Sequence, residues 1–122
     1  MQGQAAVVGV GETTYYKRGE SPKSEFQLAC EAIRNAVEDA GLTLSDVDGF
    51  TSYLDTRNDP VRLSAALGIE NVAFAARTWG GGGNGVAAAV ALADAAVSAG
   101  YAKCVVAFRA LAQGQYGRYG QA

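Results

Sequence analysis

The sequence contains no histidine among its 122 residues. This absence removes the Ser–His and Cys–His nucleophile pairs, together with the side chain most often used as a general base or metal ligand. Its two cysteines, Cys30 and Cys104, show neither metal-site nor redox-motif spacing. Catalysis by this chain alone would therefore depend on carboxylates, tyrosines, lysines or backbone dipoles. Both thiols are expected to be small core residues in a reducing cytoplasm.

Charge and long apolar runs are also scarce. Ten basic and twelve acidic residues give a net charge of −2, which provides no electrostatic footprint for nucleic acid or an anionic membrane. The first residues lack a basic segment followed by an apolar run, which argues against a secretory signal. The longest apolar run, residues 85–100, is too short to span a bilayer. Because 49% of the residues are hydrophobic, we expect residues 1–122 to build one domain with a hydrophobic core. We expect this domain to lie in the cytoplasm.

Short apolar runs alternate with helical patterns along the chain. The predicted strands are residues 5–10, 49–54, 71–79 and 103–111, and the predicted helices are residues 24–40, 60–68 and 86–99. Ser24 and Gln27 form a capping box at the first helix, while Pro60 suits the first turn of the second. This alternation predicts an α/β fold with a mostly parallel sheet and right-handed crossovers.

Two of these helices have contrasting patterns. The first predicts one buried stripe, formed by Phe26, Ala29, Cys30, Ile33, Val37 and Ala40. The third, residues 86–99, contains only Asp94 and Ser98 as polar residues, and a helix that is apolar all round is buried on every side. We expect a partner subunit or a further part of the protein to cover it, with Asp94 reaching a surface or pairing with an arginine.

The first glycine pattern that suggests nucleotide binding is incomplete. Gly9-x-Gly11 follows a predicted strand, but Thr14 occupies the third glycine position and no helix opens there. A turn at the end of the strand is the preferred interpretation.

The second pattern, Gly80 to Gly85, has the glycine spacing of a P-loop. Val86 and Ala87 stand where the lysine and the hydroxyl residue are required, so the phosphate-loop interpretation fails. A glycine-rich turn before a helix still exposes backbone N–H groups that suit an oxyanion, a thioester carbonyl or a phosphate. The alternative is that these glycines only allow the strand and the helix to approach closely.

Other charged residues are interpreted as surface groups. Asp48 is typical of a turn, and Asp59 belongs to a solvated loop between the second strand and the second helix. Arg109 and Arg118 belong to a C-terminal tail that is either mobile or meets a phosphate or a partner.

Residues 5–42, "AAVVGVGETTYYKRGESPKSEFQLACEAIRNAVEDAGL", resemble the opening of the thiolase superfamily, particularly its sterol-carrier-protein-type, lipid-transfer branch. The likeness continues through "DVDGFTSY" and "WGGGGNGVAAAVALADAAVSAGYAKCVVAFRAL" and covers nearly the whole chain. Thiolase subunits are far longer, so the chain corresponds to the first part of their N-terminal half. The resemblance implies a layered α/β fold, βαβαβαβ in this portion, with the helix at residues 86–99 buried at its centre.

Thiolases carry a nucleophilic cysteine at the N-terminus of that helix, in a pattern like Cys-x-x-Gly. Aligning its last glycine with Gly85 places the nucleophile position on Gly82, which has no side chain to acylate. The tail "FRALAQGQYGRYG", with Gly117-Arg118, is similar to a cysteine-less branch of thiolase-like steroid side-chain aldolases.

That branch implies an acyl-CoA lyase, which cleaves the side chain of a β-hydroxy acyl-CoA steroid by a retro-aldol reaction. The residues implied in substrate binding are Gly82, Gly83, Asn84, Gly85 and Arg118. The base, a tyrosine in that branch, is expected beyond residue 122, so the isolated chain is expected to be inactive. The resemblance further implies a coenzyme A thioester as substrate, no metal or other cofactor, a homodimer through residues 71–77, and a small partner protein with an OB-fold and a zinc ribbon.

Three alternatives remain open. The chain could belong to a non-catalytic acyl-CoA-binding or sterol-binding protein of the lipid-transfer type. It could be a relative of ordinary acetyl-CoA acyltransferases, or a module used for dimerisation or partner docking.

Overall fold

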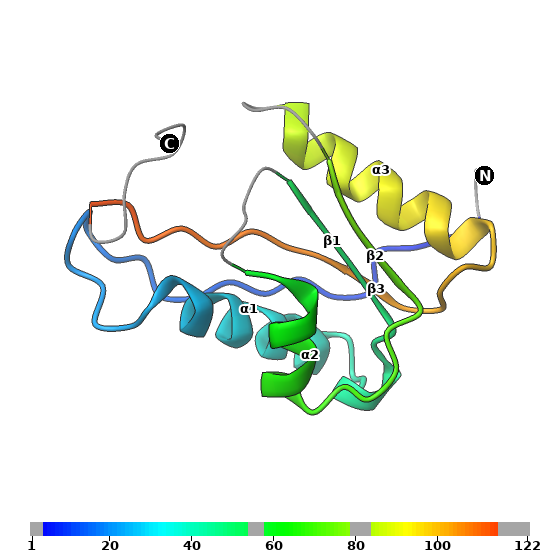
Figure 1. The fold of residues 1–122 in the computed structure, drawn as a ribbon, viewed down its shortest axis with the longest axis horizontal. Coiled ribbons are helices and arrows are strands. Elements are labelled where there is room, and N and C mark those ends of the chain that lie inside the picture. Colours follow the sequence, from blue (N-terminus) through cyan, green and yellow to red (C-terminus); the bar gives the residue numbers. More distant parts are fainter. Residues whose placement is uncertain (1–3, 54–57, 79–83, 115–122) are drawn as a thin grey trace.

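The computed structural model describes residues 4–53, 58–78 and 84–114. Within these residues three parallel strands form one sheet in the order β2-β1-β3. The strands are β1 (Gly49–Tyr53), β2 (Phe74–Thr78) and β3 (Val105–Ala107), and the helices are α1 (Glu25–Asp39), α2 (Pro60–Leu67) and α3 (Asn84–Ser98), with a 3₁₀ turn η1 (Leu44–Asp46). Helices α1 and α2 lie on one side of the sheet and α3 on the other (Figure 1). The predicted parallel α/β arrangement is confirmed.

Helix α1 begins and ends as its sequence predicts. The Gln27 N–H donates to the Ser24 hydroxyl at 3.1 Å, and the Ser24 N–H donates to Gln27 Oε1 at 2.9 Å. At the other end Gly41 has a φ of +70°, and the Leu42 N–H donates back to the carbonyl of Val37 at 3.1 Å. The predicted stripe is confirmed, because Ala29, Cys30, Ile33 and Val37 are buried.

Helix α2 corrects one prediction. Asp59 is not a solvated loop residue: its carboxylate caps the helix by accepting the Val61 N–H at 2.7 Å and the Arg62 N–H at 3.4 Å. Pro60 occupies the first turn as predicted, and Gly68, with a φ of +72°, ends the helix.

The main core lies between the sheet and the layer formed by α1 and α2. Its largest fully buried side chains include Phe50 of β1, Ile33 of α1 and Leu63 of α2. The ring of Phe50 also packs edge-on against Phe108, with 6.3 Å between the ring centroids. Since β1, α1 and α2 each contribute one of these three side chains, the sheet and both helices share a single core.

The first predicted strand is wrong. Residues 5–10 form no strand, and Val7 is 78% exposed. Gly9 and Gly11 instead lie directly on α1, where a Cβ on Gly9 would come within 2.8 Å of the Ala40 Cβ. A strand requires a neighbouring backbone to pair with it, and no described strand lies beside this segment. The two glycines therefore permit close approach to a helix and do not form a turn at a strand end.

The next stretch of this N-terminal segment borders a groove. Residues 11–18 lie on one side of it and residues 109–113 on the other, with Leu28 and Ala32 of α1 between them. The two sides meet at one end, where the Gly19 N–H donates to the carbonyl of Gln113 at 3.1 Å.

Helix α3 is covered on one side only within the described residues. Its buried residues are Gly85, Ala89 and Ala96, all directed to the sheet side, whereas Val86 and Val90 are 52% and 48% exposed. No described element lies over the outer face of this helix, so its cover by a partner subunit or a further part of the protein stays a prediction. Asp94 is half-buried and accepts a hydrogen bond from the Ser98 hydroxyl at 3.0 Å.

The last strand, β3, is shorter than the predicted 103–111, and side chains bind the backbone before and beyond it. The Asp48 carboxylate accepts the Lys103 and Cys104 N–H groups at 2.9–3.0 Å, just before β3 begins. Beyond it, the Ala112 N–H donates to Glu25 Oε1 at 3.2 Å. Throughout the described part of the chain, no helix is long and apolar enough to cross a membrane.

Candidate functional site at the carboxyl edge of the sheet

The carboxyl ends of the parallel strands meet at one edge of the sheet. Tyr53 ends β1, Thr78 ends β2, and the chain leaves β3 toward Arg109. Helix α3 begins at this same edge with Asn84 (Figure 1). In open parallel α/β sheets ligands bind outside the carboxyl ends of the strands, so this edge is the candidate site.

The aromatic ring of Tyr53 packs directly on the first turn of α3. A Cβ added to Gly85 would come within 2.8 Å of the Tyr53 Cγ and closer still to Cδ2. No side chain larger than hydrogen fits at position 85 while the ring keeps this place. Gly85 thus allows the strand end and the helix start to approach closely.

Arg109, beyond β3, lies with its guanidinium over the face of the Tyr53 ring. Its guanidinium carbon is 4.2 Å from the centroid of the Tyr53 ring, and its Nη1 donates to the Tyr53 carbonyl at 2.8 Å. The cation therefore contacts Tyr53 twice, through the face of the ring and through the backbone. Arg109 belongs to this site and not to a free tail.

Two hydroxyls also join the sheet to α3. Thr51, which is fully buried, donates to the carbonyl of Ala89 at 2.9 Å, and Thr78 donates to the carbonyl of Gly85 at 3.5 Å. With the Tyr53 ring, these contacts set the position of the first turns of α3 relative to the strand ends.

The start of α3 has the electrostatic character that a negatively charged or polarised oxygen requires. The first four N–H groups of a helix have no intrahelical partner, and the aligned peptide dipoles give that end a partial positive charge. Asn84 is exposed at this end. The carboxyl edge therefore presents hydrogen-bond donors without any cationic side chain at the helix terminus itself.

The predicted site residues are only partly within the described chain. Asn84 and Gly85 lie at the carboxyl edge, in the first turn of α3. Gly82, Gly83 and Arg118 lie outside the described residues. The two side chains that the structure adds to this edge, Tyr53 and Arg109, are 56 positions apart, and their pairing has no signal in the local sequence pattern.

Neither thiol replaces the missing nucleophile. Cys30 is buried in α1, and this burial raises its pKa, although the charges of Arg34 and Arg62 lower it in part. Cys104 precedes β3 at the amino edge of the sheet, and its pKa is raised by burial and by the carboxylates of Asp48 and Asp46. Both groups are thiols near neutral pH, whereas the thiolate is the reactive form.

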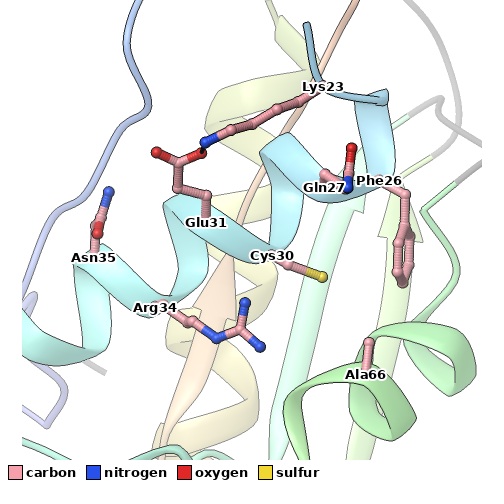
Figure 2. Close-up of a pocket in the computed structure, with 8 residues that line it drawn as sticks. All are labelled: Lys23, Phe26, Gln27, Cys30, Glu31, Arg34, Asn35 and Ala66. Atoms are coloured by element: carbon pink, nitrogen blue, oxygen red, sulfur yellow. Dashed lines mark hydrogen bonds and ion pairs between the residues drawn. The ribbon is translucent and has the colours of Figure 1, made fainter.

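A second hollow lies between α1 and α2 (Figure 2). The Lys23 Nζ and the Glu31 Oε2 form an ion pair at 2.6 Å on its rim, and the guanidinium of Arg62 lies 4.5 Å from the Phe26 ring centroid nearby. The charges of Lys23, Glu31 and Arg62 are thus engaged with their neighbours, and Arg34 also lines this hollow. Among the described residues, no group of histidine, cysteine or carboxylate side chains has a metal-binding arrangement.

Comparison with known proteins gives relatives of one kind. No model of a protein family matches the chain. It is 40% identical over 121 residues to the 17-hydroxy-3-oxo-4-pregnene-20-carboxyl-CoA lyase of Mycobacterium tuberculosis, a match covering 99% of this chain and 31% of the lyase. It is 38% identical over 120 residues to a steroid side-chain-cleaving aldolase of Thermomonospora curvata, covering 98% of this chain and 30% of the aldolase. The chain thus spans less than a third of these relatives, in their N-terminal part.

Solved structures agree. The Ltp2-ChsH2(DUF35) aldolase superposes with a TM-score of 0.83 at 36% identity, over 96% of this chain and 30% of that one. A monomeric SCP2-thiolase-like protein of Mycobacterium smegmatis gives a TM-score of 0.61 at 24% identity, covering 82% of this chain and 22% of that one. The fold is thiolase-like. At this identity the second structure supports the fold alone.

The thiolase-like fold confirms the predicted resemblance and its α/β class. The relatives also agree with the predicted branch, because they are named as a lyase and as aldolases. The substrate-binding roles of residues 82–85 and Arg118 stay predictions, and so does the nucleophile position at Gly82.

Proposed function

We propose that residues 1–122 are the N-terminal portion of a thiolase-like carbon–carbon lyase, which cleaves the side chain of a steroid β-hydroxy acyl-CoA. One observation carries this proposal: 40% identity over 99% of the chain to a 17-hydroxy-3-oxo-4-pregnene-20-carboxyl-CoA lyase. The superposition on the Ltp2-ChsH2(DUF35) aldolase supports it independently.

The proposed reaction is a retro-aldol cleavage. A base removes the proton of the β-hydroxyl, the oxygen forms a carbonyl, and the bond between the α and β carbons breaks. The electron pair of that bond passes to the thioester as an enolate, which then takes up a proton. No covalent enzyme intermediate is needed, which agrees with a glycine, Gly82, at the position where the resemblance places the thiolase nucleophile.

Residues of the carboxyl edge are proposed to stabilise the enolate oxygen. In this scheme the backbone N–H groups of residues 82–85, including Gly83 and Asn84, donate to the thioester oxygen, and Arg118 binds another part of the substrate. The base comes from outside residues 1–122. A coenzyme A thioester is the substrate, and the scheme uses no further cofactor.

The proposal extends to assembly and location. Strand β2 lies at one edge of the described sheet, so its outer backbone supports pairing with a second copy in a homodimer. The name of the Ltp2-ChsH2(DUF35) aldolase pairs two components, which supports a partner protein. The small size, OB-fold and zinc ribbon proposed for that partner come from the family resemblance. The free thiols of Cys30 and Cys104 support a reducing, cytoplasmic compartment.

The test is product analysis with the complete protein, with and without its partner. Incubation with 17-hydroxy-3-oxo-4-pregnene-20-carboxyl-CoA is expected to release a 17-ketosteroid and a shorter acyl-CoA in equal amounts, without added coenzyme A. The matched control is the same thioester without the 17-hydroxyl, which cannot form the ketone and is expected to remain intact.

Two results would overturn this function. Tight binding of both thioesters without cleavage would identify a non-catalytic lipid-transfer protein. Cleavage of a β-ketoacyl-CoA that required added coenzyme A and yielded two thioesters, with no cleavage of the 17-hydroxy thioester, would identify an ordinary acyltransferase.

A further inference from the structure

Tyr53 lies between two parts of the carboxyl edge that are distant in sequence. Its ring contacts Gly85 at the start of α3, and its carbonyl accepts the hydrogen bond from Arg109 beyond β3. A movement of Tyr53 therefore changes where the first turn of α3 sits relative to the strand ends. The three heavy atoms nearest to a Cβ added at Gly85 all belong to the Tyr53 ring.

Arg109 restricts the possible positions of that ring. One planar guanidinium contacts the face of Tyr53 at 4.2 Å and holds the carbonyl of the same residue at 2.8 Å. Lysine cannot reproduce both contacts, because an ammonium group is a compact charge without a planar face. Both contacts hold Tyr53 itself, at the face of its ring and at its backbone carbonyl, and the same ring packs on Gly85 of α3.

We propose that Tyr53 and Arg109 are positioning residues of the acyl-CoA site, which hold the first turn of α3 so that its N–H groups point at the thioester carbonyl. Neither side chain is assigned a contact with the reacting atoms. The hydroxyl of Tyr53 has no part in this role, since the ring and the backbone carbonyl make the contacts. The role rests on the proposed function, because it needs a thioester oxygen at the carboxyl edge.

The first experiment compares kcat and KM of single variants in the complete protein with its partner. Tyr53→Phe is expected to keep the wild-type values within about twofold, because it retains the ring. Tyr53→Ala and Arg109→Ala are expected to lower kcat by roughly 10- to 100-fold with a smaller change in KM, as expected for misplaced transition-state donors. The kcat of Arg109→Lys is expected to lie between those of Arg109→Ala and the wild type. Arg34→Ala, at an exposed arginine of α1, is the matched control and is expected to leave both constants unchanged.

The second experiment uses the contact with Gly85. Gly85→Ala inserts a methyl group into the ring of Tyr53 and is expected to lower kcat to a similar degree. In the double variant Gly85→Ala/Tyr53→Ala the ring is gone, so the loss is expected to be no greater than that of Tyr53→Ala alone. Non-additivity of this kind is the signature of residues that act through one contact.

Two outcomes would overturn the positioning role. The first is a multiplicative loss in the double variant, and the second is wild-type kcat in Tyr53→Ala. Thermal unfolding of each variant separates a local effect from failure to fold, and Arg109→Lys keeps the test available if an alanine variant does not fold.

Failure of the proposed function would be distinguishable. If the wild-type protein cleaves no thioester, the proposed function fails, and amide hydrogen exchange in the first turns of α3 replaces kcat as the readout for the positioning role. Faster exchange there in Tyr53→Ala and Arg109→Ala than in Arg34→Ala would support that role, and equal exchange in all variants would contradict it.

Discussion

Helices α1 and α3 each contain fifteen residues and lie on opposite sides of the same sheet, but their surroundings differ. Helix α1 is amphipathic, and its apolar stripe is buried under the sheet and α2 while its charged residues, apart from the buried Glu25, lie at the surface. Helix α3 is apolar nearly all round, and within the described residues it buries one face only. The layer that contains α1 is complete within this chain, whereas the layer that contains α3 is not.

This difference separates two kinds of exposed apolar side chain, namely those expected to be covered by another part of the protein and those expected to stay in solvent. Exposed valines of α3 such as Val90 continue an apolar pattern around the helix, and burying them would remove further apolar surface from water. An exposed valine of α2, Val61, is the one large hydrophobic residue exposed on that helix, and single exposed apolar residues are common. We therefore expect the rest of the complete protein to cover α3 and to leave Val61 in solvent.

The largest expected effect is that of a charge on the outer face of α3. Val90→Asp in the complete protein is expected to lower the free energy of unfolding by roughly 3–5 kcal/mol, because it buries a charge without a partner. The control is Val61→Asp, with an expected change within about 0.5 kcal/mol. Urea denaturation measures both. If both substitutions lowered the free energy of unfolding by the same small amount, the outer face of α3 would be as exposed as Val61 of α2, which would contradict this prediction.

A large effect is also expected in the layer that is complete. Ile33 of α1 is 1% exposed, so Ile33→Ala leaves a cavity in the core shared with Phe50 and Leu63. The expected cost is about 3 kcal/mol, within the range for large-to-small core substitutions. A loss below about 1 kcal/mol would show that this core repacks and that the layer is less complete than described.

The sheet-to-helix hydrogen bond of Thr51 has an intermediate expected effect. Thr51→Val keeps the shape of the side chain but removes the hydroxyl that donates to the Ala89 carbonyl. The free energy of unfolding is expected to fall by roughly 1–2 kcal/mol. Serine at this position retains the hydroxyl donor. The loss of this hydrogen bond is therefore expected to lower the free energy of unfolding less in Thr51→Ser than in Thr51→Val. A valine variant as stable as wild type would contradict the role of this bond.

The cap of α1 has a smaller expected effect. Ser24→Ala removes the acceptor for the Gln27 N–H, and this typically costs about 1 kcal/mol. Ser24→Asp restores an acceptor and is expected to recover the stability of the wild type. If both variants lost the same stability, the hydroxyl would not be the capping group.

The smallest expected effect concerns thiol chemistry. Burial raises the pKa of Cys30 above its ordinary value, so less thiolate is present at neutral pH than in a free cysteine. Alkylation by iodoacetamide is expected to be slower than that of free cysteine at pH 7 and to keep rising at a pH where free cysteine has levelled off. Mass spectrometry of the Cys30 peptide measures the rate. Rapid alkylation at pH 7 would contradict a covered thiol under α2.

Local signals predicted the α1–α2 layer well. The Ser24–Gln27 capping box, Pro60 and the positive-φ Gly41 and Gly68 each determine a helix boundary through nearby residues. Such boundaries are set by short-range backbone chemistry, so the sequence pattern suffices to find them.

The errors concern elements that depend on distant partners. Residues 5–10 have the composition of a strand, but a composition does not supply the neighbouring backbone that makes one. The uniform apolar pattern of α3 predicted a helix covered on every side, and the described residues cover only its sheet side. At the candidate site, motif spacing indicated Asn84 and Gly85, which lie at the carboxyl edge, while the preceding glycines lie outside the described residues. The contact between Tyr53 and Arg109 could not, because it joins the ends of two separate strands.

The most direct test of this account is amide hydrogen exchange of the complete protein, comparing α1 with α3. We predict that the amides of residues 89–97 are protected as strongly as those of residues 28–37, because both helices then lie between covered layers. Exchange in α3 that remained much faster than in α1 would contradict the claim that this chain is the N-terminal part of a larger layered fold.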